Sequence, residues 1–266
     1  MASIASSAGR RSTVLPPEPA FAMQTATEPD HPSLTIALPA FDEAPNLEHV
    51  VEQARRAAAS IADSVEILVV DDGSTDGTSR IADDLASRYD DVNVIHHPAN
   101  RGFSGAMRTC LQSARGDWIF LAPADGQIDL DTARDFFESR GNADIVVGVR
   151  QHRADALHRR FLSWGFHTLT KVLFGLPYTE FSSCFLFRTQ FVQGVDLISR
   201  PDAATILPEL LFRAHRAGAV VIERTVPHFP RRAGRPKGAD PRVVLRSLIE
   251  IVRLALALRL SRGGDS

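Results

Sequence analysis

An uninterrupted apolar run that ends in two carboxylates and a turn limits the possible folds of this chain more than any other segment. After Glu66, residues 67–70 read Ile-Leu-Val-Val, and Asp71-Asp72-Gly73-Ser74 follows directly. A run without polar alternation is typical of a strand buried on both faces, as in a parallel sheet covered by helices. Because ligands bind at the carboxyl ends of such strands, Asp71 and Asp72 are predicted to lie at a ligand-binding edge.

This segment has three interpretations: a solvated strand-to-helix turn, a calcium-binding loop or a nucleotide-binding loop. The calcium interpretation rests on an EF-hand-like spacing of Asp72, Ser74, Asp76, Gly77 and Asp83. An EF-hand loop follows a helix, however, and a buried strand is predicted here. An apolar residue is also expected where the chain has Ser79. The calcium loop is therefore rejected, and the rest of the chain decides between the other two.

Predicted strands and helices alternate along the chain. Apolar runs predict strands at 34–38, 65–70, 92–95, 118–122, 144–149 and 219–226, and helical patterns predict helices at 45–61, from Asp76 to about Tyr89, and at 104–114, 130–139, 161–174, 204–217 and 242–260. This order favours an α/β fold with a mostly parallel sheet between helix layers. The glycine motifs of dinucleotide-binding and P-loop proteins do not occur, so those versions of the architecture lose support.

Composition and charge further limit the kind of protein that this chain can be. The 266 residues are 44% hydrophobic, which supports a packed core, and the net charge of −2 gives no general attraction to nucleic acid. Residues 1–32 are rich in Ala, Ser, Pro and Thr and predict a disordered leader, followed by a domain at 33–240 and an amphipathic helix and tail at 241–266. No transmembrane helix is predicted. Cys110 and Cys184 have no metal-ligand spacing and are expected to be reduced thiols in a cytosolic protein.

Carboxylates end two of the predicted strands. Asp71 and Asp72 follow the second strand, and Asp125 follows the fourth, in Pro123-Ala124-Asp125-Gly126-Gln127. These side chains are expected to converge on a nucleotide whose diphosphate is held through a divalent cation. Oxygen ligands and phosphate select Mg²⁺ or Mn²⁺, which engage few protein carboxylates.

Several ordered motifs between Leu34 and Lys237 carry a family resemblance. They are Leu38-Pro39-Ala40-Phe41-Asp42-Glu43, Val70 to Thr78, Asn100-Arg101-Gly102, Ala114 to Asp117, Ala124 to Gln127, Gly148-Val149-Arg150, Phe174-Gly175-Leu176, Ser182 to Phe185 and Arg231 to Lys237. With these motifs the chain resembles family 2 glycosyltransferases of the GT-A fold. Within that family it is similar to the polyprenol-phosphate hexosyltransferases of the dolichol-phosphate mannose synthase type.

The resemblance implies a set of donor-site residues. Pro39, Ala40, Phe41, Glu43 and Asp72 would line the nucleotide pocket together with Asp71 and Gly73, Asp125 would reach the metal and the sugar diphosphate, and Gln127 would lie beside the donor. The family commonly has Asp-x-Asp where this chain has Pro123-Ala124-Asp125, so one carboxylate is missing and metal affinity is expected to be weaker. Cys184 stands where the family commonly has Gly.

A basic segment after the fifth predicted strand is the candidate acceptor site. Arg150, Arg159 and Arg160 lie close together in sequence and lead into the apolar, aromatic pattern of 161–174. The cluster is either a solvated loop or a site for a lipid phosphate, and the helix either packs in the core or meets an isoprenoid chain. The lipid-phosphate interpretation is favoured because the cluster is expected at the same sheet edge as Asp125.

The acceptor determines whether a general base is needed. A phosphate monoester is already largely ionised at neutral pH, so it attacks the anomeric carbon, and inverts it, without a general base. The metal and Arg231 or Lys237 are expected to stabilise the departing diphosphate. For a hydroxyl acceptor the candidate bases are Asp129, Asp131, Asp202 and Glu209.

The sequence therefore predicts transfer of a hexose from GDP- or UDP-hexose to a polyprenyl phosphate by a cytoplasmic protein, peripheral at the inner face of the cell membrane. The alternatives are a family 2 enzyme with a hydroxyl acceptor, or a degenerate nucleotide-sugar binding protein, as Pro123 would indicate. A sugar nucleotidyltransferase is disfavoured because residues 39–43 contain no cation. The amphipathic helix at 242–260 is expected to dock on the domain, pair with a second protomer or lie in the membrane interface.

Overall fold

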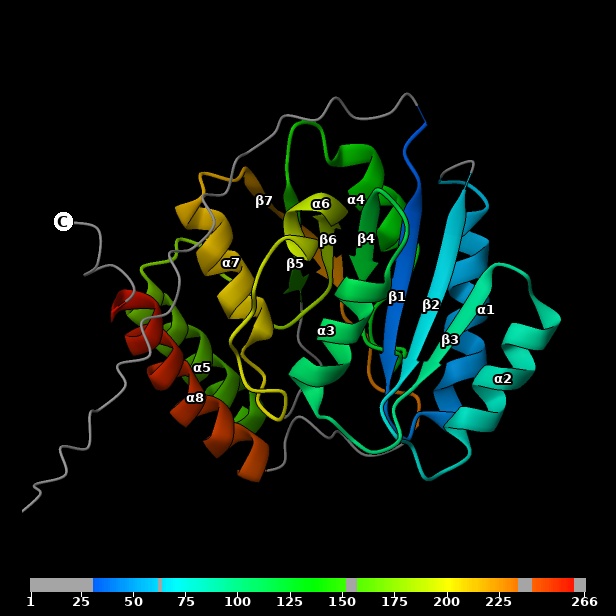
Figure 1. Ribbon diagram of the computed structural model, residues 1–266, viewed down its shortest axis with the longest axis horizontal. Coiled ribbons are helices and arrows are strands. Elements are labelled where there is room, and N and C mark those ends of the chain that lie inside the picture. The colour runs from blue at the N-terminus through cyan, green and yellow to red at the C-terminus, as the bar shows by residue number, and fades with distance from the viewer. Residues whose placement is uncertain (1–30, 62–63, 152–156, 234–240, 261–266) are drawn as a thin grey trace, which may run out of the picture.

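A seven-stranded sheet with helices on both faces forms the described part of the molecule (Figure 1). The computed structural model describes residues 31–61, 64–151, 157–233 and 241–260. Its strands are β1 (Leu34–Ala40), β2 (Val65–Asp71), β3 (Val92–His96), β4 (Trp118–Leu121), β5 (Ile145–Gln151), β6 (Phe185–Arg188) and β7 (Val221–Pro227). Its helices are α1 (Ala44–Ala58), α2 (Thr78–Arg88), α3 (Phe103–Ser113), α4 (Thr132–Ser139), α5 (Leu157–Phe174), α6 (Thr189–Gln193), α7 (Ile206–Arg216) and α8 (Pro241–Leu260).

The strand order is β3-β2-β1-β4-β6-β5-β7. β1 pairs in parallel with β2 and β4, β2 with β3, and β5 with β7, whereas β6 is antiparallel to both β4 and β5. The predicted mostly parallel α/β sheet is thus confirmed. The sequence reading missed β6, which has only four residues and lies between strands that are far away in the chain.

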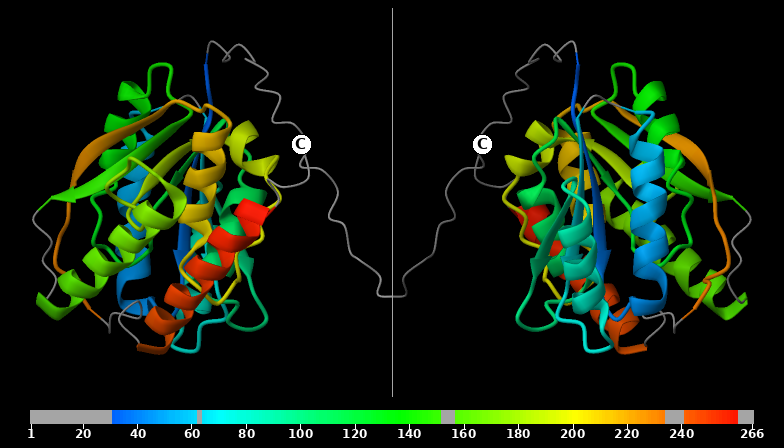
Figure 2. Two further views of the ribbon diagram at one scale, coloured as in Figure 1. Left: turned by 90° about the vertical axis from the view of Figure 1, so that its left-hand side faces the viewer. Right: turned by 90° about the vertical axis from the view of Figure 1, so that its right-hand side faces the viewer.

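Helices cover both faces of the sheet (Figure 2), and an apolar cluster on each face forms the core. Leu47 of α1, Leu85 of α2 and Phe136 of α4 pack on one face. On the other face α3, α5, α6, α7 and α8 pack together, and the buried residues of α8 are Ser247, Glu250, Ile251, Leu254, Ala255 and Leu258. The last five residues of β2 are all buried, as expected for a strand covered on both faces.

The carboxyl ends of six strands lie at one edge of the sheet, because β6 alone runs in the opposite direction. This edge is at the bottom of Figure 1, where the loops after β1, β2 and β4 come together with the segment after β7. Among the described residues, none of the helices combines the length and the apolar character needed to cross a bilayer.

Candidate functional site

Asp71 holds the turn that follows β2. Its Oδ1 accepts a hydrogen bond from the Ser74 N–H at 3.1 Å, and its Oδ2 accepts one from Ser79 Oγ at 2.5 Å and lies 2.9 Å from His96 Nδ1. Burial raises the pKa of Asp71, but the hydrogen bonds from Ser74, Ser79 and His96 outweigh burial and leave the pKa below its ordinary value. Asp71 is therefore an ionised anchor for the turn.

Asp72 joins three loops at the carboxyl edge. Its N–H donates to the Ala40 carbonyl at 2.8 Å, which ties β2 to the end of β1. Its carboxylate accepts from the N–H groups of Arg101 and Gly102, both at 2.9 Å, and lies 2.6 Å from His97 Nδ1. Asp72 thus fixes the 97–102 loop beside the predicted nucleotide pocket.

Gly73 lies where a side chain does not fit. Its φ of +71° is in the left-handed region, and a Cβ atom there would lie 2.6 Å from the carbonyl carbon of Ala99 and the nitrogen of Asn100. Gly77, four residues later, has a φ of +96° but nothing within 4 Å of such a Cβ. The two glycines therefore share the backbone conformation and differ in the space around it.

Gly73→Ala is expected to lower the free energy of unfolding by about 3 kcal/mol or more, because strain and a backbone clash add together. Gly77→Ala is the matched control, and strain alone is expected to lower its stability by about 1–2 kcal/mol. Urea unfolding of both variants measures the difference. Equal losses in the two variants would show that the close approach of residues 99 and 100 has no energetic effect.

A guanidinium group connects two carboxylates at the centre of the edge. Arg231 Nη2 donates to Glu43 Oε1, and Arg231 Nη1 lies 3.6 Å from Asp125 Oδ2. Glu43 is buried at the start of α1, and its Oε2 accepts from Asn46 Nδ2 at 2.8 Å. The Ala233 carbonyl receives both Arg231 Nε at 2.8 Å and Asn46 Nδ2 at 3.3 Å. The loops after β1, β4 and β7 thus meet in one charged cluster.

The segment after β7, here called the β7 loop (residues 228–233), packs along the loop after β4. The Phe229 N–H donates to the Gln127 carbonyl at 2.9 Å, and Gln127 Nε2 donates to the Phe229 carbonyl at 3.2 Å. Ile128 and His228 form an isolated antiparallel bridge. Gln127 therefore holds the β7 loop in the position from which Arg231 reaches Asp125.

Burial and neighbouring charges act together on the Asp125 carboxylate. Burial raises its pKa above the ordinary value, while the Gln127 N–H, at 3.1 Å from Oδ1, and the charge of Arg231 oppose the rise. Glu43 adds to the rise, and the charge of Arg150 opposes it. A partly buried carboxylate with a raised pKa gains stabilisation of its charged form from a further cation, so Asp125 is suited to bind one.

Arg150 lies at the carboxyl end of β5, but its guanidinium group is already engaged. Its Nε and Nη2 lie 3.0 and 3.1 Å from the two oxygens of the buried Glu180, and Nη2 also donates to Ser182 Oγ at 2.9 Å. His167 Nε2 is 3.3 Å from Glu180 Oε1. Arg150 thus contributes positive charge at this edge while its orientation is set by Glu180.

The remaining predicted residues fall into three groups. The Pro39 and Ala40 carbonyls accept from the N–H groups of Ala124 and Asp72, so the end of β1 organises both neighbouring loops, and Phe41 follows it. Arg159 and Arg160 belong to the first turn of α5, and their side chains lie outside the described part. Lys237 lies outside the described residues altogether.

Two contributors to the site were not predicted from the sequence. Glu180 is a single acidic residue inside the otherwise apolar and neutral stretch from Leu176 to Phe187, and an isolated charge of this kind signals a buried ion pair. Asn46 has no comparable signal, because asparagine in the first turn of a helix is common on surfaces. Its Oδ1 is buried and accepts no hydrogen bond from the described residues.

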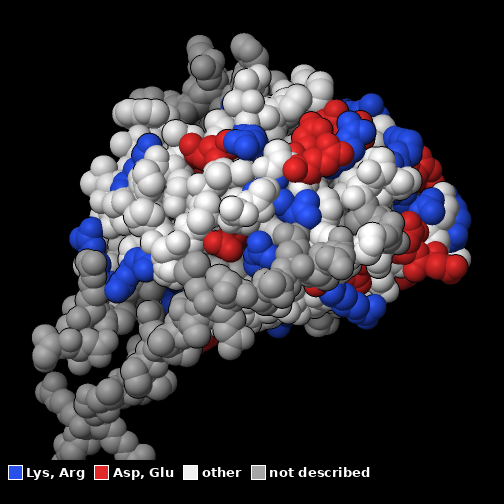
Figure 3. Space-filling view, turned by 90° about the horizontal axis from the view of Figure 1, so that it is seen from above, with Lys and Arg blue, Asp and Glu red and all other residues white. Residues whose placement is uncertain are grey.

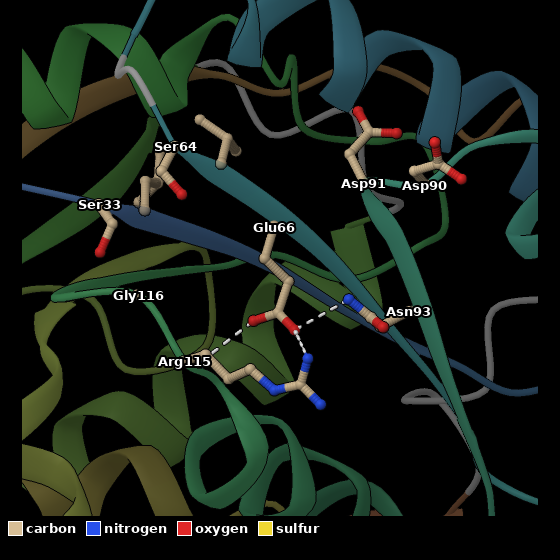
Figure 4. A pocket seen from close by; sticks show the side chains of 10 residues that line it. Ser33, Ser64, Glu66, Asp90, Asp91, Asn93, Arg115 and Gly116 are labelled. Atoms are coloured by element: carbon tan, nitrogen blue, oxygen red, sulfur yellow. Dashed lines mark hydrogen bonds and ion pairs between the residues drawn. The ribbon is translucent and has the colours of Figure 1, made fainter.

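A hollow at the opposite edge of the sheet is not part of this site. It lies at the amino ends of the strands and is lined by Ser33, Leu34, Ser64, Val65, Glu66, Asp90, Asp91, Asn93, Arg115 and Gly116 (Figure 4). Glu66 accepts hydrogen bonds there from Thr35, Asn93 and the Arg115 N–H. Figure 3 views the molecule from this edge and shows acidic and basic side chains side by side. Because its hydrogen bonds are all to groups of the protein, Glu66 has a structural role in this hollow.

The oxygen ligands at the carboxyl edge fit a sparse divalent-cation site. The described residues contain no group of three or more His, Cys, Asp or Glu side chains placed to hold a metal ion. Asp125 offers one partly buried carboxylate, and Glu43 lies across the Arg231 guanidinium from it. Mg²⁺ and similar ions are usually bound by one or two carboxylates together with substrate phosphates. The arrangement thus fits a metal that is bound together with a diphosphate ligand.

Comparison with protein families gives one match that covers more than half of the chain. The family model described as "Glycosyl transferase family 2" matches residues 35–199. This range runs from the second residue of β1 to beyond β6, includes the cluster residues Glu43 and Asp125, and ends before Arg231.

Two curated relatives and one solved structure show how far the similarity extends. An undecaprenyl-phosphate mannosyltransferase of Micrococcus luteus is 26% identical over 238 residues, which are 85% of this chain and 95% of that protein. The dolichyl-phosphate beta-glucosyltransferase ALG5C of Trichomonas vaginalis is 27% identical over 165 residues, which are 56% of this chain and 49% of that protein, so the chain spans about half of its length. Glucosyl-3-phosphoglycerate synthase from Mycobacterium tuberculosis, crystallised with Mn²⁺, UDP-glucose and glycerol 3-phosphate, superposes with a TM-score of 0.61 at 18% identity, over 88% of this chain and 81% of that one. The last likeness establishes the GT-A fold.

Proposed function

Because this chain belongs to glycosyl transferase family 2, we propose that it moves a hexose from GDP- or UDP-hexose to a polyprenyl phosphate with inversion at the anomeric carbon. The observation that carries the proposal is the cluster of Glu43, Arg231 and Asp125 at the carboxyl edge, with Arg150 nearby. The names of the two curated relatives, which act on undecaprenyl and dolichyl phosphates, support the acceptor class.

The donor nucleotide is proposed to bind over the ends of β1 and β2. Pro39, Phe41 and Gly73 are partly exposed at this surface, while the buried Asp71 and Asp72 hold the loops beneath it. The buried Oδ1 of Asn46 accepts no hydrogen bond from the described residues. A buried acceptor without a donor is destabilising, so a ribose hydroxyl or a base N–H of the nucleotide is a suitable partner.

Asp125 is proposed to hold Mg²⁺ or Mn²⁺ together with the donor diphosphate, and the neighbour that was crystallised with Mn²⁺ and UDP-glucose supports this choice. The metal supplies positive charge to the diphosphate. Arg231 is proposed to turn from Glu43 and Asp125 toward the diphosphate as it leaves, with Lys237 as a second cation. A guanidinium group placed at a developing negative charge stabilises the transition state.

The acceptor phosphate is proposed to approach from the side of β5 and the first turn of α5. Arg150, oriented by Glu180, and Arg159 and Arg160 would hold it. A phosphate oxygen forms the bond to the anomeric carbon while the bond from that carbon to the diphosphate breaks. Because the phosphate is already ionised, no general base is needed. An acceptor with an isoprenoid tail favours a peripheral position at a membrane surface, and the cytoplasmic face of the cell membrane is proposed as that surface.

The test is transfer of label from radiolabelled UDP- and GDP-hexoses into a product that is extracted by organic solvent, with polyprenyl phosphate and Mn²⁺ or Mg²⁺ supplied. Arg159→Ala/Arg160→Ala is expected to lower kcat/KM for the lipid acceptor about 100-fold, because two charge-assisted contacts are lost. The matched control is Arg88→Ala/Arg115→Ala, which removes two exposed arginines far from the carboxyl edge.

Label in the lipid phase that depends on Arg159 and Arg160 supports the proposal and identifies the donor. Turnover of the donor with label only in water-soluble products would instead assign a hydroxyl acceptor. Donor binding without any transfer would assign a nucleotide-sugar binding protein.

A further inference from the structure

The outward face of α8 carries an apolar stripe. Its inner face is fixed to the domain, because Glu250 Oε1 accepts from the Arg200 N–H at 3.0 Å and Ser247 Oγ accepts from the Ala204 N–H at 3.0 Å. On the opposite side, the exposed fractions are 59% for Leu245, 62% for Ile249, 42% for Val252 and 56% for Leu256. Their spacing of four, three and four residues places them in one line along the helix. The stripe is thus the side of α8 that the domain leaves uncovered.

α5 extends this surface. It lies beside α8 in Figures 1 and 2, and Arg259 Nη2 of α8 donates to the Leu173 carbonyl of α5 at 2.6 Å. Trp164 and Val172, which are two turns apart on α5, are 62% and 70% exposed. The outward sides of the two helices, here called the α5–α8 face, therefore expose six large apolar side chains, including a tryptophan. Exposed apolar surface of this extent marks an interaction site.

Arginines accompany the apolar stripe. Arg242, Arg246, Arg253 and Arg259 are all exposed on α8. The only acidic residue of α8, Glu250, is buried and paired with Arg253 at 2.5 Å, and α5 contains no acidic residue. Arg246 lies 3.5 Å from Asp202, so at least two of the four arginines have an acidic partner. The face thus combines apolar side chains with positive charge.

The sign of this charge decides between two occupants. A second copy of the chain, paired through a two-fold axis, would bring the arginines of both α8 helices together, and like charges at an interface are unfavourable. An anionic lipid surface complements both features, because its headgroups pair with arginines while apolar side chains and tryptophan enter the interfacial layer.

We propose that the α5–α8 face docks on an anionic lipid bilayer. This inference deepens the proposed function, since it gives the surface through which an enzyme with a lipid acceptor would lie on the membrane. Figure 1 shows that α8 begins at the same end of the molecule as the carboxyl edge of the sheet. Docking on this face therefore brings the charged cluster close to the headgroup layer.

The test is co-sedimentation of the full chain with vesicles of phosphatidylcholine and phosphatidylglycerol at 7:3, compared with phosphatidylcholine alone. Binding is expected for the anionic vesicles and is expected to weaken with added salt. Ile249→Glu/Leu256→Glu is expected to lower the partition coefficient at least tenfold, because two apolar contacts are lost and two negative charges face the lipid. The control is Val220→Glu, an exposed apolar residue at the amino edge of the sheet.

Three results would overturn the inference: equal binding to both vesicles, binding that is unchanged in Ile249→Glu/Leu256→Glu, or a dimer of the native chain in light scattering that this double variant converts to a monomer. The last result would assign the face to self-association. Thermal unfolding of each variant by circular dichroism verifies that it is folded. A transfer assay with a short-chain, water-soluble polyprenyl phosphate separates the two proposals. If no sugar is transferred to this acceptor, the proposed function is rejected, and vesicle binding still tests the α5–α8 face.

Discussion

Asp125→Asn is expected to lower kcat/KM for sugar transfer about 1,000-fold. The amide keeps the size of the side chain and its hydrogen bond to the Gln127 N–H, but it removes the negative charge that would hold the metal beside the diphosphate. Loss of several kcal/mol of charge stabilisation in the transition state corresponds to a change of this size. Initial rates over a range of Mn²⁺ concentrations measure it, and higher Mn²⁺ is expected to restore activity only in part.

Asp129→Asn is the matched control for Asp125→Asn. Asp129 is an aspartate four residues later, and its carboxylate accepts from the Asp131 N–H at 3.1 Å without a contact to Arg231. The activity of Asp129→Asn is expected to stay within about threefold of the native value, since Asp129 is not part of the cluster formed by Glu43, Arg231 and Asp125. The reverse pattern, with Asp125→Asn active and Asp129→Asn inactive, would contradict the assignment of Asp125 and would favour a general base and a hydroxyl acceptor.

Arg231→Met is expected to lower kcat about 100-fold, because the departing diphosphate loses a preorganised cation. The pH profile gives a second readout. Burial raises the pKa of Asp125, and the charge of Arg231 opposes that rise. Removing the guanidinium therefore raises the pKa further, so the carboxylate form is lost at a higher pH. The acid limb of kcat/KM is expected to move to higher pH in the variant.

Arg232→Met controls for the loss of positive charge from the β7 loop. Arg232 is adjacent in sequence and exposed, and within the described part of the chain it forms no ion pair with Glu43 or Asp125. Its kcat and acid limb are expected to stay close to those of the native chain. If Arg231→Met left both quantities unchanged, the link between Arg231 and Asp125 would have no role in catalysis.

The parallel part of the sheet was predictable because its signals are local. The mainly apolar runs of β1, β2 and β4 and the turn residues that follow them are contiguous in sequence. Strands that alternate with helices form parallel sheets, and their carboxyl ends then share one edge. This is why Asp71, Asp72 and Asp125 could be assigned to the same edge before the fold was known.

β6 could not be predicted on the same grounds. Its four residues read Phe-Leu-Phe-Arg, and they are an antiparallel strand only because β4 and β5 lie on either side of them. Strands this short depend on cross-strand pairing with residues about 40 to 70 positions away, for which local propensity gives no signal. The separation of β4 from β5 by β6 is consequently a property of the assembled sheet.

For the arginines, the sequence predicted the role, and only the tertiary structure gave the partners. The sequence identified Arg150 and Arg231 as cations for phosphate groups, from their residue type and their place after predicted strands. It gave no partner for either. The structure places Glu180 on Arg150 and places Glu43 and Asp125 on Arg231, across 188 residues in the case of Glu43.

Local chemistry therefore determined the class of fold, the edge that carries the site and the types of group that gather there. These follow from hydrophobic runs, turn residues and the shared direction of parallel strands. Only the tertiary structure decided which charges meet, which arginine is held in place by a buried acid and which face of α8 remains exposed. Ion pairs between distant residues and the burial of one helix face depend on how the loops and helices pack, and packing is set by the whole chain at once.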